Sequence, residues 1–127
     1  MATGIEGWHS VLASRDYSLL DELLSDDCVF HSPVVHSPQE GKALTKMYLT
    51  AAASVLLESQ FRYVREVVGS NDAVCEFTAE IEGIHINGVD MITWNDEGKI
   101  VDFKVMVRPL KAVNLMHAKM KAMLEQM

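Results

Sequence analysis

One stretch of the sequence alternates large apolar residues with other residues: Ile84-His85-Ile86-Asn87-Gly88-Val89-Asp90-Met91-Ile92-Thr93-Trp94. In a β-strand, alternate residues share a face, so this pattern places Asp90 on the same face as Ile92 and Trp94. Apolar surroundings disfavour a carboxylate and raise its pKa. Such a group can donate a hydrogen bond or transfer a proton near neutral pH, so Asp90 is the first candidate for a functional residue.

The segments around this stretch predict an antiparallel meander. Strand-like runs occupy about 60–69, 72–82, 84–95 and 99–108. Hairpin-turn signals separate two pairs of them, at Gly69-Ser70-Asn71-Asp72 and at Asn95-Asp96-Glu97-Gly98. Alternation predicts two inward apolar faces, made of Val101, Phe103, Val105 and Val107 and of Ala73, Cys75, Phe77, Ala79 and Ile81. One side of the sheet should therefore be dry, and Asp90 should point to it.

Helical patterns lie on both sides of the meander. Apolar spacing predicts helices at 5–14, at roughly 16–24 with Asp16 as N-cap, and from Gly41 to Leu57. A short strand is expected from Cys28 to Ser32, and a last helix begins at Pro109. This order predicts an α+β fold with helices on one face of a curved sheet, in a single domain over 1–127.

Composition restricts the function. The net charge of −7 argues against a nucleic-acid partner, which needs a basic surface. No apolar run is long enough to span a membrane, and no basic-then-apolar leader begins the chain, so a cytoplasmic location is expected. Cys28 and Cys75 are too few for a disulfide framework and are expected to be small buried residues.

Four segments, taken together, resemble the NTF2-like superfamily, especially its SnoaL-like cyclase and ketosteroid-isomerase branches. They are the run from Asp16 to Phe30, the prolines at 33 and 38 followed by Gly41, the run Val89–Trp94 followed by Gly98–Val101, and the strand before Pro109. The resemblance implies a cone in which a highly curved sheet wraps around helices and a deep apolar cavity. It also implies a homodimer that pairs through the outer face of the sheet.

The resemblance assigns roles to residues by position. The ketosteroid-isomerase branch keeps a carboxylic acid neutral at pH 7, and in this chain that acid falls on Asp90, the base on Ser32 and the tyrosine on Trp8. Serine cannot replace that base, so steroid-type isomerisation is disfavoured. SnoaL-like cyclases carry an aspartate at the position of Asp90. The resemblance therefore implies that Asp90 is the acid/base of a ring closure that needs no cofactor or metal. Gly88 stands where epoxide-hydrolase-like members carry an arginine.

Further candidates surround Asp90 in this interpretation. His31 and His36 flank the turn at Pro33 and would shuttle a proton with Asp90 or else lie exposed in a loop. The Tyr48 hydroxyl would polarise a ligand carbonyl. Asp90 itself would be a pocket acid/base or a buried structural carboxyl hydrogen-bonded to Trp8 or to a neighbouring side chain. The expected ligand-binding residues are Trp8, Phe30, Ser32, His36, Phe61, Phe77, Phe103 and Val105.

The last helix carries a methionine stripe, and three functions remain open. The stripe, formed by Met116, Met120, Met123 and Met127, is either an adaptable lid or a packing face. The first hypothesis is a cofactor-independent isomerase, cyclase or dehydratase that acts on an apolar carbonyl compound. The alternatives are a non-catalytic binding protein for an apolar ligand and a dimeric interaction scaffold. A sealed interior would favour the scaffold.

Overall fold

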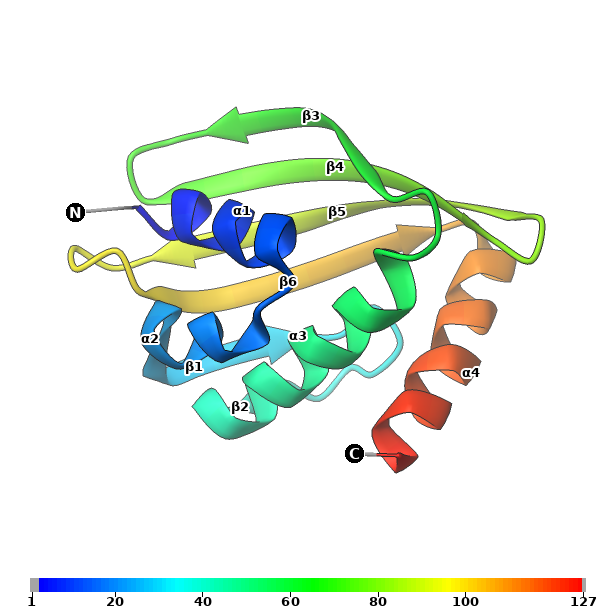
Figure 1. Ribbon diagram of the computed structural model, residues 1–127, viewed down its shortest axis with the longest axis horizontal. Helices are drawn as coiled ribbons and strands as arrows, with labels where there is room; N and C mark the ends of the chain where they lie inside the picture. The colour runs from blue at the N-terminus through cyan, green and yellow to red at the C-terminus, as the bar shows by residue number, and fades with distance from the viewer. Residues whose placement is uncertain (1–2, 127) are drawn as a thin grey trace.

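The computed structural model describes residues 3–126 and shows an α+β fold, as predicted. Its elements in chain order are α1 (Gly4–Ser14), a 3₁₀ turn (Tyr17–Leu19), α2 (Leu20–Leu23), β1 (Leu24–His31), β2 (Gln39–Glu40), α3 (Lys42–Leu56), β3 (Arg62–Val68), β4 (Asp72–Ile81), β5 (Ile84–Trp94), β6 (Ile100–Arg108) and α4 (Leu110–Glu125). The helices lie on one side of a curved sheet, and α4 stands across the end opposite α1 (Figure 1). None of the helices in this range is long and apolar enough to cross a membrane.

The sheet contains the predicted meander and one unpredicted pairing. Its strand order is β2-β1-β6-β5-β4-β3, and strands β3 to β6 pair antiparallel in sequence order. The first strand, β1, pairs with β6 in parallel, so the sheet is mixed. The predicted antiparallel pairing therefore holds for β3 to β6 but does not extend to this edge of the sheet. Pairing of two segments some seventy residues apart depends on how the chain returns, which local alternation does not specify.

The N-terminal half differs from the prediction in its boundaries. The helix expected at 16–24 is only a 3₁₀ turn and a single α-helical turn, and β1 begins at Leu24 instead of Cys28. Leu20 and Leu24 are both fully buried, so their apolar character was correctly interpreted but their strand or helix state was not. The two-residue strand β2, which pairs with Val29 and Phe30, was not predicted.

The first helix is held at its start by a capping box. The Thr3 side chain accepts a hydrogen bond from the Glu6 amide, and the Glu6 carboxylate accepts one from the Thr3 amide. This reciprocal pair satisfies amides that have no partner inside the helix. The helix buries Ile5, Trp8 and Val11 against the sheet, which places the indole of Trp8 in the interior.

The inner face of β5 confirms the alternation that defined the fold. Ile86, Gly88, Asp90, Ile92 and Trp94 are all buried, whereas His85 and Thr93 on the opposite face are exposed. The predicted inner face of β4 is also buried along its whole length. Both cysteines are buried and unpaired. The sequence therefore placed Asp90 on the correct, dry side of the sheet.

Two bulges change which residues face inward. Along β5, Thr93 pairs with Asp102 of β6, and the next residue, Trp94, pairs with Ile100. Val101 is therefore the extra residue of the bulge, and Ile100 takes the buried position. In β3 the register with β4 shifts between Tyr63 and Arg65. A bulge reverses the parity of every residue beyond it. Strict alternation was therefore wrong at Val101.

Candidate functional site

Asp90 is the last acceptor in a part-buried chain of two hydrogen bonds. The Tyr63 hydroxyl donates to Oδ2 of Asp90 at 2.5 Å, and the Trp8 indole Nε1–H donates to the Tyr63 oxygen at 2.8 Å. The three residues come from α1, β3 and β5, and only the folded chain brings them together. The expected structural contact between Trp8 and Asp90 therefore runs through Tyr63 instead of directly. Tyr63 was not among the predicted site residues.

The environment of Asp90 sets its protonation. The side chain is 6% exposed, and burial raises its pKa to about 7, although the hydrogen bond from Tyr63 acts in the opposite direction. Burial and the neighbouring Asp90 raise the pKa of Tyr63 well above its usual range, so Tyr63 remains a neutral donor. Asp90 is thus near half-ionised at neutral pH. This is the state in which a carboxyl can both accept and donate protons.

A second polar cluster lies beside this chain. Cys75 is the cross-strand neighbour of Asp90, and its thiol donates to Oε2 of Glu66 at 3.1 Å. The same Glu66 oxygen is 2.6 Å from His9 Nε2. Burial, and after it the Glu66 carboxylate, raises the pKa of the Cys75 thiol, which stays protonated. Cys75 therefore gives Asp90 a neutral neighbour.

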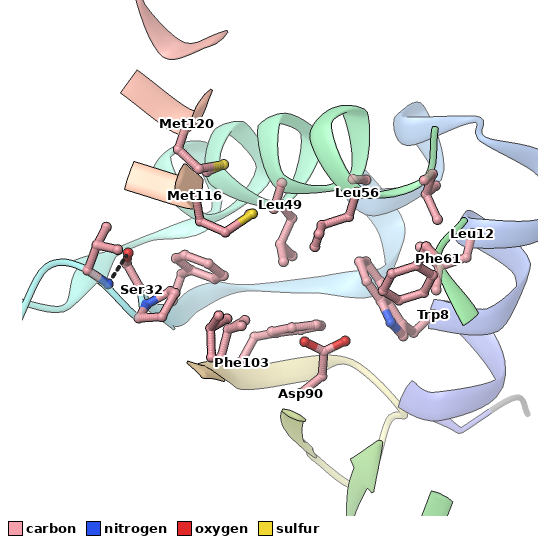
Figure 2. A pocket seen from close by; sticks show the side chains of 18 residues that line it. Trp8, Leu12, Ser32, Leu49, Leu56, Phe61, Asp90, Phe103, Met116 and Met120 are labelled. Atoms are coloured by element: carbon pink, nitrogen blue, oxygen red, sulfur yellow. Dashed lines mark hydrogen bonds between the residues drawn. The ribbon is translucent and has the colours of Figure 1, made fainter. Parts of the chain in front are cut away.

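A cavity of about 50 Å³ extends from Asp90 between the sheet, α3 and α4. In Figure 2, Asp90 and Trp8 lie toward one end, and Ser32, Met116 and Met120 lie toward the other. Asp90 is the only residue with an ionisable side chain on its wall within residues 3–126. Its second oxygen, Oδ1, has no hydrogen-bond partner in that part of the chain, so it is the oxygen left for a ligand.

Most of the predicted ligand-binding residues do surround this cavity. They are Trp8, Phe30, Ser32, Phe61, Phe103 and Val105. Phe103 packs edge-on against Trp8 with ring centroids 4.8 Å apart, and Phe30 lies beside Phe103. At the far end, Oγ of Ser32 accepts a hydrogen bond from the Val34 amide at 3.2 Å. The structure adds residues that the sequence did not single out for the cavity wall: Leu12, Leu49 and Leu56.

Four of the predicted site residues lie elsewhere. His31 faces the outside of the sheet, where Nε2 is 2.9 Å from Oδ1 of Asp102, so it cannot work with Asp90. His36 shares an outer groove with His31. Tyr48 stacks behind Phe30 and borders a groove next to α4 instead of the cavity. Phe77 is fully buried core, because it fills the space above Gly88 on the neighbouring strand.

Gly88 allows this close packing. A Cβ at this position would meet the Phe77 ring and would lie 2.7 Å from the Met106 carbonyl oxygen. No side chain fits without movement of the backbone on the adjacent strand. The arginine that epoxide-hydrolase-like relatives are expected to carry here therefore has no room in this chain.

The methionine stripe of α4 contributes both to the packing of the domain and to the wall of the cavity. Met116 is buried, and both Met116 and Met120 reach the cavity from α4. Met127 lies outside the described residues. The stripe thus packs at least partly on its own domain. It also gives one end of the cavity a wall of unbranched, flexible side chains.

Comparison with known proteins agrees with this fold and shows the family. Residues 5–103 match the SnoaL-like domain family. A steroid delta-isomerase from Pseudomonas aeruginosa is 35% identical, with 97% of this chain and 90% of that chain covered and a TM-score of 0.90. An uncharacterised protein with a cystatin-like fold from Silicibacter pomeroyi DSS-3 is 33% identical, with coverage of 96% and 85% and a TM-score of 0.86. The chain belongs to the SnoaL-like family of the NTF2-like superfamily.

More distant structures share the fold. An NTF2-like protein of unknown function from Mesorhizobium loti is 20% identical over 84% of this chain and 88% of its own, with a TM-score of 0.72. At this identity the similarity concerns the fold alone. Among curated proteins the chain has no match. Family membership therefore supports an isomerase-like or cyclase-like pocket without naming a reaction.

Proposed function

We propose that this protein is an acid–base enzyme of the isomerase or cyclase type that acts on an apolar carbonyl compound. One observation carries the proposal: a single ionisable side chain, with a pKa of about 7, lies on the wall of an otherwise apolar cavity. A proton donor and acceptor matched to neutral pH is what general acid–base catalysis requires. The 35% identity to a steroid delta-isomerase supports an isomerase, and because Ser32 cannot act as the base of the ketosteroid-isomerase branch, that role falls to Asp90 as well.

The reaction uses Asp90 twice. As the carboxylate, it removes a proton from the carbon next to a carbonyl, and the electrons of the broken C–H bond form an enolate. As the acid, it returns that proton either to another carbon of the conjugated system, which is an isomerisation, or to the alkoxide formed when the enolate closes a ring. Tyr63 positions Asp90 and favours its ionised form through the 2.5 Å hydrogen bond.

The size of the cavity limits the substrate. A volume of about 50 Å³ is well below the roughly 300–1,000 Å³ of common ligand sites. A slender molecule, or displacement of Met116 and Met120, is therefore needed for binding. The same observation favours the second candidate, a protein that only holds a small apolar ligand.

The test combines turnover with a matched control. A monocyclic β,γ-unsaturated ketone is incubated with the protein, and the conjugated product is followed by ultraviolet absorbance. Asp90→Asn should lower the rate by about 10²- to 10⁴-fold. Asp102→Asn alters an aspartate on the outer face of the neighbouring strand and should leave the rate unchanged. Tight ligand binding without turnover in the wild type would instead favour the binding protein.

We further propose that two copies pair through the outer face of the sheet. Val67 and Val74 are cross-strand neighbours on this face, and they are 62% and 41% exposed. Clustered apolar side chains of this kind mark interaction surfaces. Sedimentation should show a dimer, and Val74→Glu should weaken it. A monomer at high protein concentration would contradict this proposal.

A further inference from the structure

A notch with basic side chains adjoins the cavity at the end away from Asp90. Its wall contains His31, His36 and Lys104, and it measures about 430 Å³. Within residues 3–126 no carboxylate lines it and none pairs with Lys104. The nearest acid is Asp102, which bonds His31. In a chain with a net charge of −7, this is a local concentration of positive or protonatable groups.

The notch and the cavity lie next to each other at this end of the sheet. They share Ser32, Pro33, Val105 and Val107 on their walls. Their proximity follows from the strand pairing at this edge of the sheet. The parallel pairing of β1 with β6 ends at His31 and Lys104, and β6 continues to Arg108 with no strand beside it on that edge among the described residues. The loop after β1, from Ser32 to Val34, lines the cavity beside this unpaired edge of β6.

We propose that the notch binds the carboxylate of an amphipathic substrate whose apolar part extends into the cavity toward Asp90. This rests on the proposed function and names its substrate class: an apolar carbonyl compound that also carries an acid group. The basic side chains complement the anion, whereas the apolar wall accepts only the hydrocarbon part. A carboxylate beside Asp90 itself would meet a buried, partly ionised acid and would be repelled. The charges therefore fix the orientation of the substrate.

The test compares octanoate with methyl octanoate, which differ in charge but share the same chain. Dissociation constants are measured by NMR titration at low salt. The acid should bind about fivefold more tightly than the ester, the scale of one partly exposed charge pair. Added salt should weaken binding of the acid and not of the ester. Equal affinities, or failure of the acid to bind, would overturn the proposal.

Variants locate the site. The double variant Lys104→Gln/His36→Gln should abolish the preference for the acid. Lys111→Gln, which alters an exposed lysine of α4 outside the notch, should retain it. In Asp90→Asn the acid-to-ester ratio should stay the same, and a marked rise would mean that the carboxylate lies at the Asp90 end and would overturn the proposal. The notch proposal is tested by the ratio of two dissociation constants, whereas the proposed function is tested by turnover. Failure of one proposal can therefore be distinguished from failure of the other.

Discussion

The two faces of the sheet carry aspartates on neighbouring strands with opposite environments. Asp90 on the inner face of β5 is 6% exposed, lies among apolar side chains and has a pKa of about 7. Asp102 on the outer face of β6 has a side chain that is 39% exposed and pairs with His31 at 2.9 Å. The residue type is the same, so the difference comes from the surroundings of each carboxyl, chiefly its solvation. Orientation in the sheet thus separates a buried carboxyl with a raised pKa from a half-exposed carboxyl that contacts a histidine.

The largest expected effect concerns the pH dependence of stability. The folded pKa of Asp90, about 7, lies above the ordinary value of 3.8, so folding takes up a proton between these values. The contribution of Asp90 to stability is then greatest below pH 4 and falls as the pH rises through 7. The free energy of unfolding of Asp90→Asn, taken relative to that of the wild type, should rise by on the order of 4 kcal/mol between pH 4 and pH 8. Urea denaturation of both proteins at pH 4 and pH 8 measures this difference. The same difference at both pH values would contradict the raised pKa.

A somewhat smaller loss is expected when the inner face is overfilled. Gly88→Ala forces a Cβ against the Phe77 ring and the Met106 carbonyl, and should destabilise the fold by about 3 kcal/mol. Thermal or chemical unfolding measures the loss. Combination with Phe77→Leu should recover part of it, because one of the two obstacles becomes smaller. An unchanged midpoint in the single variant would show that the strands separate more easily than the packing indicates.

Removal of the Tyr63 hydroxyl tests how far one hydrogen bond sets the pKa of Asp90. Tyr63→Phe deletes the donor to Asp90, so the pKa of Asp90 should rise above about 7, and the folded state should lose about 2 kcal/mol at pH 8. Carbon-detected NMR titration of the carboxyl gives the pKa. Tyr48→Phe is the matched control, since the Tyr48 hydroxyl has no hydrogen bond within residues 3–126. The same pKa in both variants would refute the role assigned to Tyr63.

The smallest effect belongs to the outer face. Asp102→Asn removes the negative charge beside His31 and leaves both side chains in reach of water. Exposed pairs of this kind contribute at most about 1 kcal/mol, so the unfolding midpoint should scarcely move at any pH. A loss as large as that of Gly88→Ala would mean that this pair is buried in solution, as in a dimer through the outer face.

The candidate site was only partly predictable, and the reason differs from residue to residue. The burial of Asp90 follows from alternation within one strand, and Phe103 and Val105 follow from the same rule on the next. His31 also obeys the rule, since Phe30 faces the cavity and His31 faces outward, which excludes it as a partner of Asp90. Tyr63 was missed because its role depends on a bulge and on two partners that are distant in sequence.

By itself, the sequence determined the strands of the meander, the dry face of the sheet, the family and the buried position of Asp90. The strands and their faces follow from short-range periodicity, which the backbone geometry of a strand converts directly into a face. Only the tertiary structure decided the parallel pairing of β1 with β6, the unpaired edge of β6 beyond it and the hydrogen-bond chain Trp8–Tyr63–Asp90. Those features join segments that are far apart along the chain, and their free energy depends on the closure of the whole sheet around its helices.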